Sequence, residues 1–213
     1  MSAIYNFLGN SIYFVMAAVA AWGAYCVIIV FNRVKQKQFK SEQIQSGFLQ
    51  ALEEPLLRGE YEQASQICTG DRRALCQLCQ LAIDNRQIGF AKIKQLVSDR
   101  FQRDVLQDLE FRLSWVITVI KTGPMLGLLG TVLGMMAAFE KLAASKTVQA
   151  DKLAGDIQFA LITTALGLAI ALPLTMAVAY ININIRKMED MVSFGLNQFL
   201  EVYRQAIIRH PVS

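Results

Sequence analysis

The sequence predicts an all-α integral membrane protein with three transmembrane helices, long cytoplasmic helical extensions, an outer N-terminus and a cytoplasmic C-terminus. Its 213 residues are 54% hydrophobic and only 18% charged. The charges avoid two windows completely, residues 2–32 and 157–185, and a third apolar window, 113–139, carries only Lys121. A helix needs about 20 apolar residues to cross a bilayer, so each window is long enough for one crossing.

The first crossing is expected at residues 12–31, after a periplasmic N-terminus at 1–11. A cleaved signal peptide is the competing interpretation of an N-terminal apolar run, but residues 1–10 contain no lysine or arginine. Basic residues follow the run instead, at positions 33, 35, 37 and 40. Because positive charge is retained on the cytoplasmic side, the N-terminus is expected to face outward.

Residues 32–112 are expected to form a cytoplasmic helical segment. Its breakers are Pro55 and four glycines, and turns are predicted near Gly59 and Gly70. From residue 91 onward, apolar side chains recur at every fourth position, on one face of a helix that continues without a breaker into the second span. This stripe contains Ile93, Val97, Phe101, Val105 and Leu109.

The second and third crossings are expected at 113–139 and 157–185. They enclose a short periplasmic loop at 140–156 with balanced charges, and a cytoplasmic C-terminal helix follows at 186–213. That tail carries another apolar stripe, so the second and third helices are predicted to extend below the bilayer as one bundle. Packing explains the stripes, and no cofactor is expected.

Neither enzyme chemistry nor a nucleic-acid surface is predicted. The net charge is +4, but basic residues alternate with acidic ones instead of forming a stripe. The glycine run that begins at Gly123 lacks the Lys-Ser/Thr of a phosphate loop. No carboxylate lies inside a predicted span, so acid-base catalysis has no candidate there. We therefore expect a non-enzyme without catalytic residues.

Four cysteines raise the question of a metal site. Cys76 and Cys79, with Cys68 nearby, resemble half of a zinc site. The single histidine, His210, lies at the far end of the chain, so a four-ligand site would have to form between subunits. Reduced cytosolic thiols are the preferred interpretation, with Cys26 in the first span, and no metal is expected.

Small residues follow a helical spacing in both later spans. Glycines in the second span occur at i, i+4, i+7 and i+11, and the third span repeats this rhythm. Such faces let membrane helices approach closely, and threonine hydroxyls bond across the contact or back to the preceding turn. Helix packing and an ion-facing or partner-facing role both remain open. The residues are Gly123, Gly127, Gly130, Gly134 and Thr131, followed by Ala160, Thr163, Thr164, Gly167 and Ala171.

Lys121 has two interpretations. A snorkelling anchor, whose stem reaches the headgroups, is the preferred one. The other is a place at the cytoplasmic mouth of an ion path, or in a contact with the acidic tail of a partner.

The string GLLGTVLG at 127–134, after a proline, and the string ALITTALGL at 160–168 resemble the MotA/TolQ/ExbB proton channel family. Three spans favour its ExbB/TolQ branch. The resemblance implies an inner-membrane motor subunit driven by the proton-motive force. Five such chains would surround the helices of two small ExbD/TolR-like partners, each with an intramembrane aspartate, and act on a TonB-like or TolA-like effector. It also implies that Thr131 and Thr164 face the pore, with Thr163 beside them.

One position departs from the family pattern. Many ExbB and TolQ sequences place a glutamate just before the Ala-Leu of the third-span motif, where this chain has Phe159. Asp156 and Gln158 are close in sequence but occupy different helical faces. The alternative function is a passive oligomeric membrane scaffold that conducts no ions.

Overall fold

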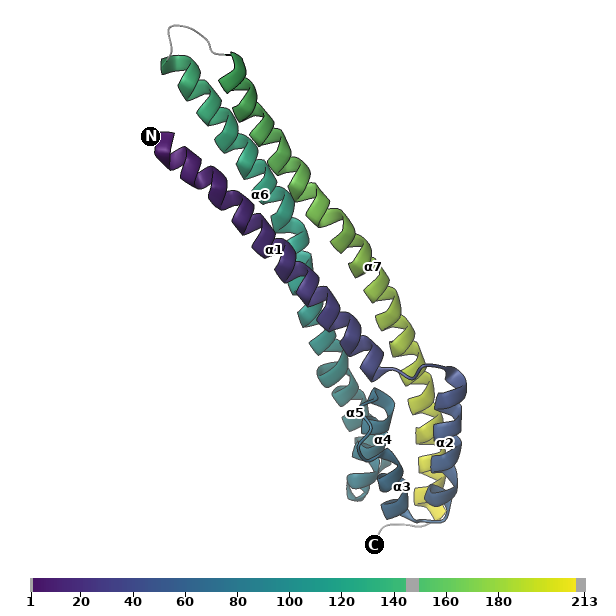
Figure 1. Cartoon of the computed structure of the whole chain (residues 1–213). Coiled ribbons are helices and arrows are strands. Elements are labelled where there is room, and N and C mark those ends of the chain that lie inside the picture. Colours follow the sequence, from purple (N-terminus) through teal and green to yellow (C-terminus); the bar gives the residue numbers. More distant parts are fainter. Residues whose placement is uncertain (1, 145–149, 210–213) are drawn as a thin grey trace. The chain divides into compact units, whose positions relative to one another are not determined.

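The computed structural model describes the backbone of residues 2–144 and 150–209, and the side chains of 11–143 and 153–209. These residues form helices and turns without a strand, which confirms the all-α class (Figure 1). Within them, three stretches are long and apolar enough to cross a membrane, as predicted. The helices are α1 (Ser2–Lys37), α2 (Glu42–Leu57), α3 (Tyr61–Cys68), α4 (Ala74–Asp84), η1 (Arg86–Ile88), α5 (Phe90–Arg100), the π-helix η2 (Phe101–Gln107), α6 (Asp108–Ala144) and α7 (Ala150–Arg209).

Each predicted span is part of a longer helix. The windows 12–31, 113–139 and 157–185 lie within α1, α6 and α7 respectively. The direction in which these helices cross a membrane stays a prediction.

The segments predicted between and beyond the spans are mostly helical. The expected N-terminal segment at 1–11 belongs to α1 from Ser2 onward. In the expected loop at 140–156, residues 145–149 lie outside the described residues, and α6 and α7 occupy the rest. The expected tail is helical as far as Arg209, and His210 also lies outside the described residues.

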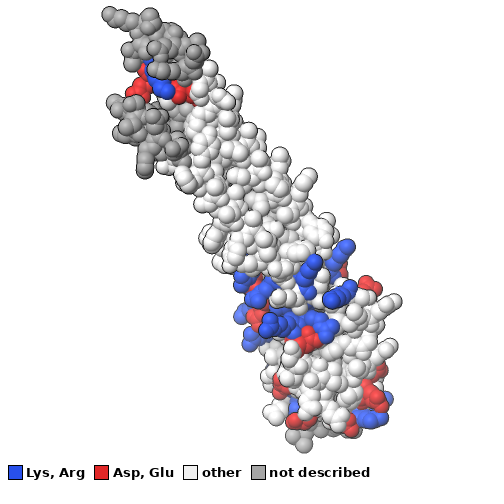
Figure 2. All heavy atoms as spheres, viewed as in Figure 1, with Lys and Arg blue, Asp and Glu red and all other residues white. Residues whose placement is uncertain are grey.

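The chain divides into two compact units. Unit 1 comprises residues 1–29 and 112–180, where α6 and α7 run side by side in opposite directions (Figure 1). Gly23 brings α1 close to both, because a Cβ there would lie 2.8 Å from Val119 Cγ1 and 2.9 Å from Leu174 Cδ1. Figure 2 shows a broad uncharged band on this unit. Large apolar side chains are exposed on it, which suits contact with lipid.

Unit 2 comprises residues 30–111 and 181–213. Helices α2 to α5 each contact the next one along the chain, and the end of α7 lies beside α2 (Figure 1). Tyr203 is fully buried, and its hydroxyl donates to the Ala82 carbonyl at 3.0 Å. Gln45 of α2 reaches the α7 backbone, where its Nε2 donates to the Met191 carbonyl at 2.7 Å. Polar groups buried in this unit thus anchor α2 and α4 to α7.

Glycines make the sharp turns of unit 2. Gly59, Gly70 and Gly89 have φ angles of 79°, 84° and 86°, in the left-handed region that favours glycine. The turns predicted near Gly59 and Gly70 are therefore present, and Gly89 precedes α5.

The predicted apolar stripe of residues 93–109 is buried at every fourth position. In an α-helix with 3.6 residues per turn, a period of four drifts steadily around the axis. The π-helix η2 lies within this stretch and takes more residues per turn, which returns the stripe to the core. The sequence pattern predicts a helix here but not its π geometry.

Candidate functional site

The glycine face of α6 packs against α7 of the same chain in unit 1. A Cβ at Gly127 would lie 2.8 Å from the Thr163 carbonyl oxygen, and one at Gly167 would lie 2.7 Å from the Gly123 carbonyl oxygen. These neighbours are backbone atoms, so side-chain rotation cannot make room. A Cβ at Gly134 would lie 2.9 Å from the Ala160 Cβ and 3.0 Å from the Asp156 carbonyl oxygen. The glycines thus allow backbone-to-backbone packing within one subunit.

Thr163 lies inside this helix contact. Its side chain is fully buried, and a Cβ at Gly130 would lie 2.6 Å from the Thr163 Cβ. The Thr163 hydroxyl donates to the Ala160 carbonyl at 2.8 Å and lies 3.4 Å from the Gly127 carbonyl. Thr163 therefore serves the α6–α7 packing in this structure, although the sequence groups it with the pore-facing threonines.

Thr164 and Thr131 are only partly buried. The Thr164 hydroxyl donates across the contact to the Gly127 carbonyl at 3.2 Å, and the Thr131 hydroxyl donates to the Leu128 carbonyl at 2.6 Å. A hydroxyl has one proton and two lone pairs. Because both protons are used on carbonyls, these side chains present hydrogen-bond acceptors to whatever lies beyond them.

Helical geometry places α6 residues on a common flank. At about 100° per residue, Lys121 lies about 120° from Gly127 around α6, and Thr131 lies about 40° from it in the same sense. Val119, which contacts Gly23 of α1, lies about 80° away in the opposite sense. Lys121 and Thr131 thus lie on the side of α6 that faces away from α1.

Helical geometry also places the residues of α7 around its axis, at about 100° per residue. Thr164 lies about 100° from Thr163, whereas Phe159 lies about 40° away in the opposite sense. The Phe159 ring contacts Tyr13 of α1 edge-on, with 5.4 Å between ring centroids. We call the side of α6 and α7 that faces away from α1, with Thr131, Lys121 and Thr164, the polar flank.

The remaining predicted residues of the small-residue faces are buried. Ala160 and Ala171 are 2% and 8% exposed, and the four glycines of α6 are buried. Lys121 is exposed, and no ion pair of this residue is present among the described residues. The predicted set therefore divides into a packing face and the polar flank.

Two interactions near the start of α7 were not predicted from the sequence. Phe159 fills space between Tyr13 and Gly134, because a Cβ at Gly134 would lie 3.2 Å from Phe159 Cδ1. Lys141 Nζ forms an ion pair with Asp156 at 2.7 Å, which joins α6 to α7. Opposite charges at 141 and 156 are visible in the sequence, but only the fold shows that they meet.

The cysteines of unit 2 are buried in the contact between α3 and α4. Cys68, Cys76 and Cys79 are fully buried, and the Cys76 thiol donates to Asp71 Oδ2 at 3.3 Å. Arg73 holds Asp71 by hydrogen bonds, which lowers the pKa of that carboxyl to about 2. No group of three histidine, cysteine or acidic side chains that could hold a metal ion is found in the described part of the chain.

We expect the three buried thiols to resist alkylation. Burial raises the pKa of Cys68 from 9.0 to about 12, and it raises the pKa of Cys76 and Cys79 as well. Only the thiolate reacts, so iodoacetamide at pH 8 should modify these cysteines at least tenfold more slowly in the folded chain than in the denatured chain. Mass spectrometry of the alkylated peptides measures this, and rapid labelling of the folded chain would contradict the burial.

The raised thiol pKa also sets a pH dependence. Unfolded thiols lose protons from about pH 9, whereas Cys68 in the folded chain keeps its proton to about pH 12. The contribution of the buried thiols to the free energy of unfolding is therefore complete below about pH 9, and it falls as the pH rises toward 12.

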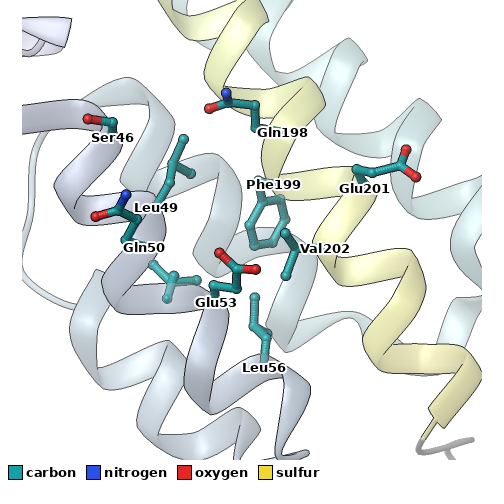
Figure 3. Close-up of a pocket in the computed structure, with 10 residues that line it drawn as sticks. Ser46, Leu49, Gln50, Glu53, Leu56, Gln198, Phe199, Glu201 and Val202 are labelled. Carbon is teal, nitrogen blue, oxygen red and sulfur yellow. The ribbon is translucent and has the colours of Figure 1, made fainter. Parts of the chain in front are cut away.

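A hollow of about 370 Å³ lies between α2 and α7 in unit 2 (Figure 3). Its floor is apolar, with Leu56 and Phe199, and Glu53 lies between the two helices. None of the predicted site residues lines it.

More than half of the chain matches a known protein family. The profile of the MotA/TolQ/ExbB proton channel family matches residues 76–193. The Tol-Pal system protein TolQ of Haemophilus influenzae is 34% identical over 107 residues, 50% of this chain and 47% of TolQ. The biopolymer transport protein ExbB of Xanthomonas campestris is 41% identical over 69 residues, 32% and 27% of the two chains. An ExbB of Helicobacter pylori is 39% identical over 70 residues, 33% and 48%.

The three apolar helices, the close α6–α7 contact and the polar flank define an α-helical membrane protein with a polar surface on spanning helices. The family match covers more than half of the chain, from α4 into the last third of α7. The chain therefore belongs to the MotA/TolQ/ExbB proton channel family, and its similar sequences are of the ExbB and TolQ kind. The match spans less than half of each of these relatives.

Proposed function

We propose that this chain is the channel-forming subunit of a proton-driven motor in the inner membrane of a bacterium. The polar flank is the observation that carries the proposal. Polar and charged side chains within membrane spans usually face a bundle interior or a water-filled cavity, because exposure to lipid is costly. Thr131, Lys121 and Thr164 share one face of two long apolar helices, and that face suits a lumen better than lipid.

The orientation belongs to the same proposal. Arg33, Lys35 and Lys37 follow the apolar part of α1, and Arg186 and Lys187 follow that of α7. Positive charge at these ends supports a cytoplasmic location of unit 2, with the N-terminus outside.

A partner supplies the acid in this mechanism. The windows 113–139 and 157–185 contain no aspartate or glutamate, so the carboxyl group that carries protons comes from elsewhere. The polar-flank threonines accept hydrogen bonds, so they pair with a protonated carboxylic acid more readily than with a carboxylate. Loss of the proton then releases the acid from the threonine.

The assembly we propose has five of these chains around two small ExbD/TolR-like partners, and it acts on a TonB-like or TolA-like effector. One charge that crosses the membrane releases about 2.3 kcal/mol per 100 mV, so repeated proton transfers are needed for mechanical work. The glycines of α6 pack against α7 of the same chain, and both a motor and a passive scaffold can contain such a contact. Close packing alone therefore does not distinguish the two.

Purification of the native complex, followed by reconstitution in liposomes, tests the proposal. We expect a small single-span subunit with an intramembrane acid to co-purify, and a pH gradient to drive proton uptake only when both proteins are present. A functional complex without such a subunit, or full flux through this chain alone, would overturn the motor in favour of another arrangement.

A further inference from the structure

Thr175 lies on the polar flank, although the sequence motifs do not include it. The 11 residues from Thr164 to Thr175 make about three turns, which leaves the two about 20° apart around α7. Thr175 is exposed on the surface of unit 1. It thus repeats the orientation of Thr164 further along the helix.

Lys121 lies within two turns of Thr175 along the helix pair. Gly123 and Gly167 contact each other through backbone atoms, which places these two residues at one level of α6 and α7. The helices are antiparallel, so Lys121, two residues before Gly123, and Thr175, eight residues after Gly167, lie on the same side of this level. At 1.5 Å per residue, the two are about 9 Å apart along the axis.

Thr175 presents the same chemistry as Thr131. Its hydroxyl donates to the Ala171 carbonyl at 2.8 Å, so its lone pairs remain available as acceptors. A threonine bonded in this way is also tolerated at a lipid surface. Lys121 is evidence against lipid here, because a charged side chain on the same flank and within two turns favours water or a polar partner.

We propose that Thr175 is a further ion-path residue, on the cytoplasmic side of Thr164, which accepts hydrogen bonds from the water or hydronium that moves along the flank. This inference rests on the proposed function. It adds a third hydroxyl acceptor to those of Thr131 and Thr164, and it places Lys121 beside the aqueous part of the path.

Thiol accessibility tests whether water reaches this position. In the complex purified with its partner and carrying Cys26→Ala, we expect Thr175→Cys to react with a charged methanethiosulfonate at least tenfold faster than Met176→Cys. Met176 is 76% exposed and adjacent, but it lies about 100° further around α7 and is expected to face lipid. Equal or slower labelling of Thr175→Cys would overturn the inference.

Proton flux in liposomes then tests the function of the hydroxyl. Thr175→Val should lower the flux at least threefold with assembly unchanged, and Thr175→Ser should retain it. A merely structural role predicts loss of assembled complex instead. Thr122→Val is the matched control, because its hydroxyl also donates to a carbonyl one turn back, at 2.8 Å. Unchanged flux in Thr175→Val overturns this inference alone, whereas a wild-type complex that conducts nothing overturns the proposed function with it.

Discussion

Replacement of Gly167 by alanine is expected to force α6 and α7 apart. The new Cβ would lie 2.7 Å from the Gly123 carbonyl oxygen and 3.2 Å from Pro124 Cα, and both are backbone atoms. A change of rotamer therefore cannot relieve this overlap. Overpacking of this kind costs about 1–3 kcal/mol, so we expect the free energy of unfolding to fall by that amount.

Gly155→Ala is the matched control, because Gly155 lies in the same helix and a Cβ there meets nothing within 4 Å. Alanine is favoured over glycine in a helix by about 0.5–1 kcal/mol, so this variant should be neutral or slightly more stable. Thermal unfolding in detergent, followed by circular dichroism, compares the two. Equal stability of both variants would show that α6 and α7 are packed less closely at Gly167 than in the structure.

The fold class could be predicted from the sequence because the bilayer imposes a simple requirement. The window 157–185 is uncharged and longer than the roughly 20 residues that a helix needs to cross the bilayer, so it predicts a spanning helix. The turns at Gly59 and Gly70 were also predictable, since glycine is the residue that adopts a positive φ without strain. The π-helix η2 could not be predicted. Its widened turn depends on how the apolar stripe packs against other helices, and the local sequence does not contain that information.

The site could be predicted only in part. Spacing alone groups Thr163 with Thr164, yet the two are about 100° apart, and the position of α6 decides which of them is buried. The Phe159–Tyr13 contact depends on the place of α1 against α7, which no local pattern encodes. Thr175 was missed because it lies outside the motifs, although its helical phase relative to Thr164 can be counted in the sequence.

Thr164→Val is expected to reduce proton flux at least tenfold, while the complex still assembles. Valine keeps the branched shape but has no acceptor for a protonated acid or for water. Loss of one hydrogen bond of about 1.4 kcal/mol in the transition state corresponds to a tenfold slower step. The bond to the Gly127 carbonyl is lost too, but such interhelical bonds contribute only about 0.6 kcal/mol on average, so assembly should survive.

The adjacent Thr163→Val provides the control. Its hydroxyl is buried and used within the chain, so its loss should affect stability slightly and flux less than twofold. Thr164→Ser, which restores the hydroxyl, should recover most of the flux. Flux per assembled complex in liposomes, with oligomer size measured by native mass spectrometry, separates these effects. Unchanged flux in Thr164→Val would show that the Thr164 hydroxyl is not part of the proton path. Equal losses in both valine variants would show that packing, rather than an outward-facing acceptor, limits the flux.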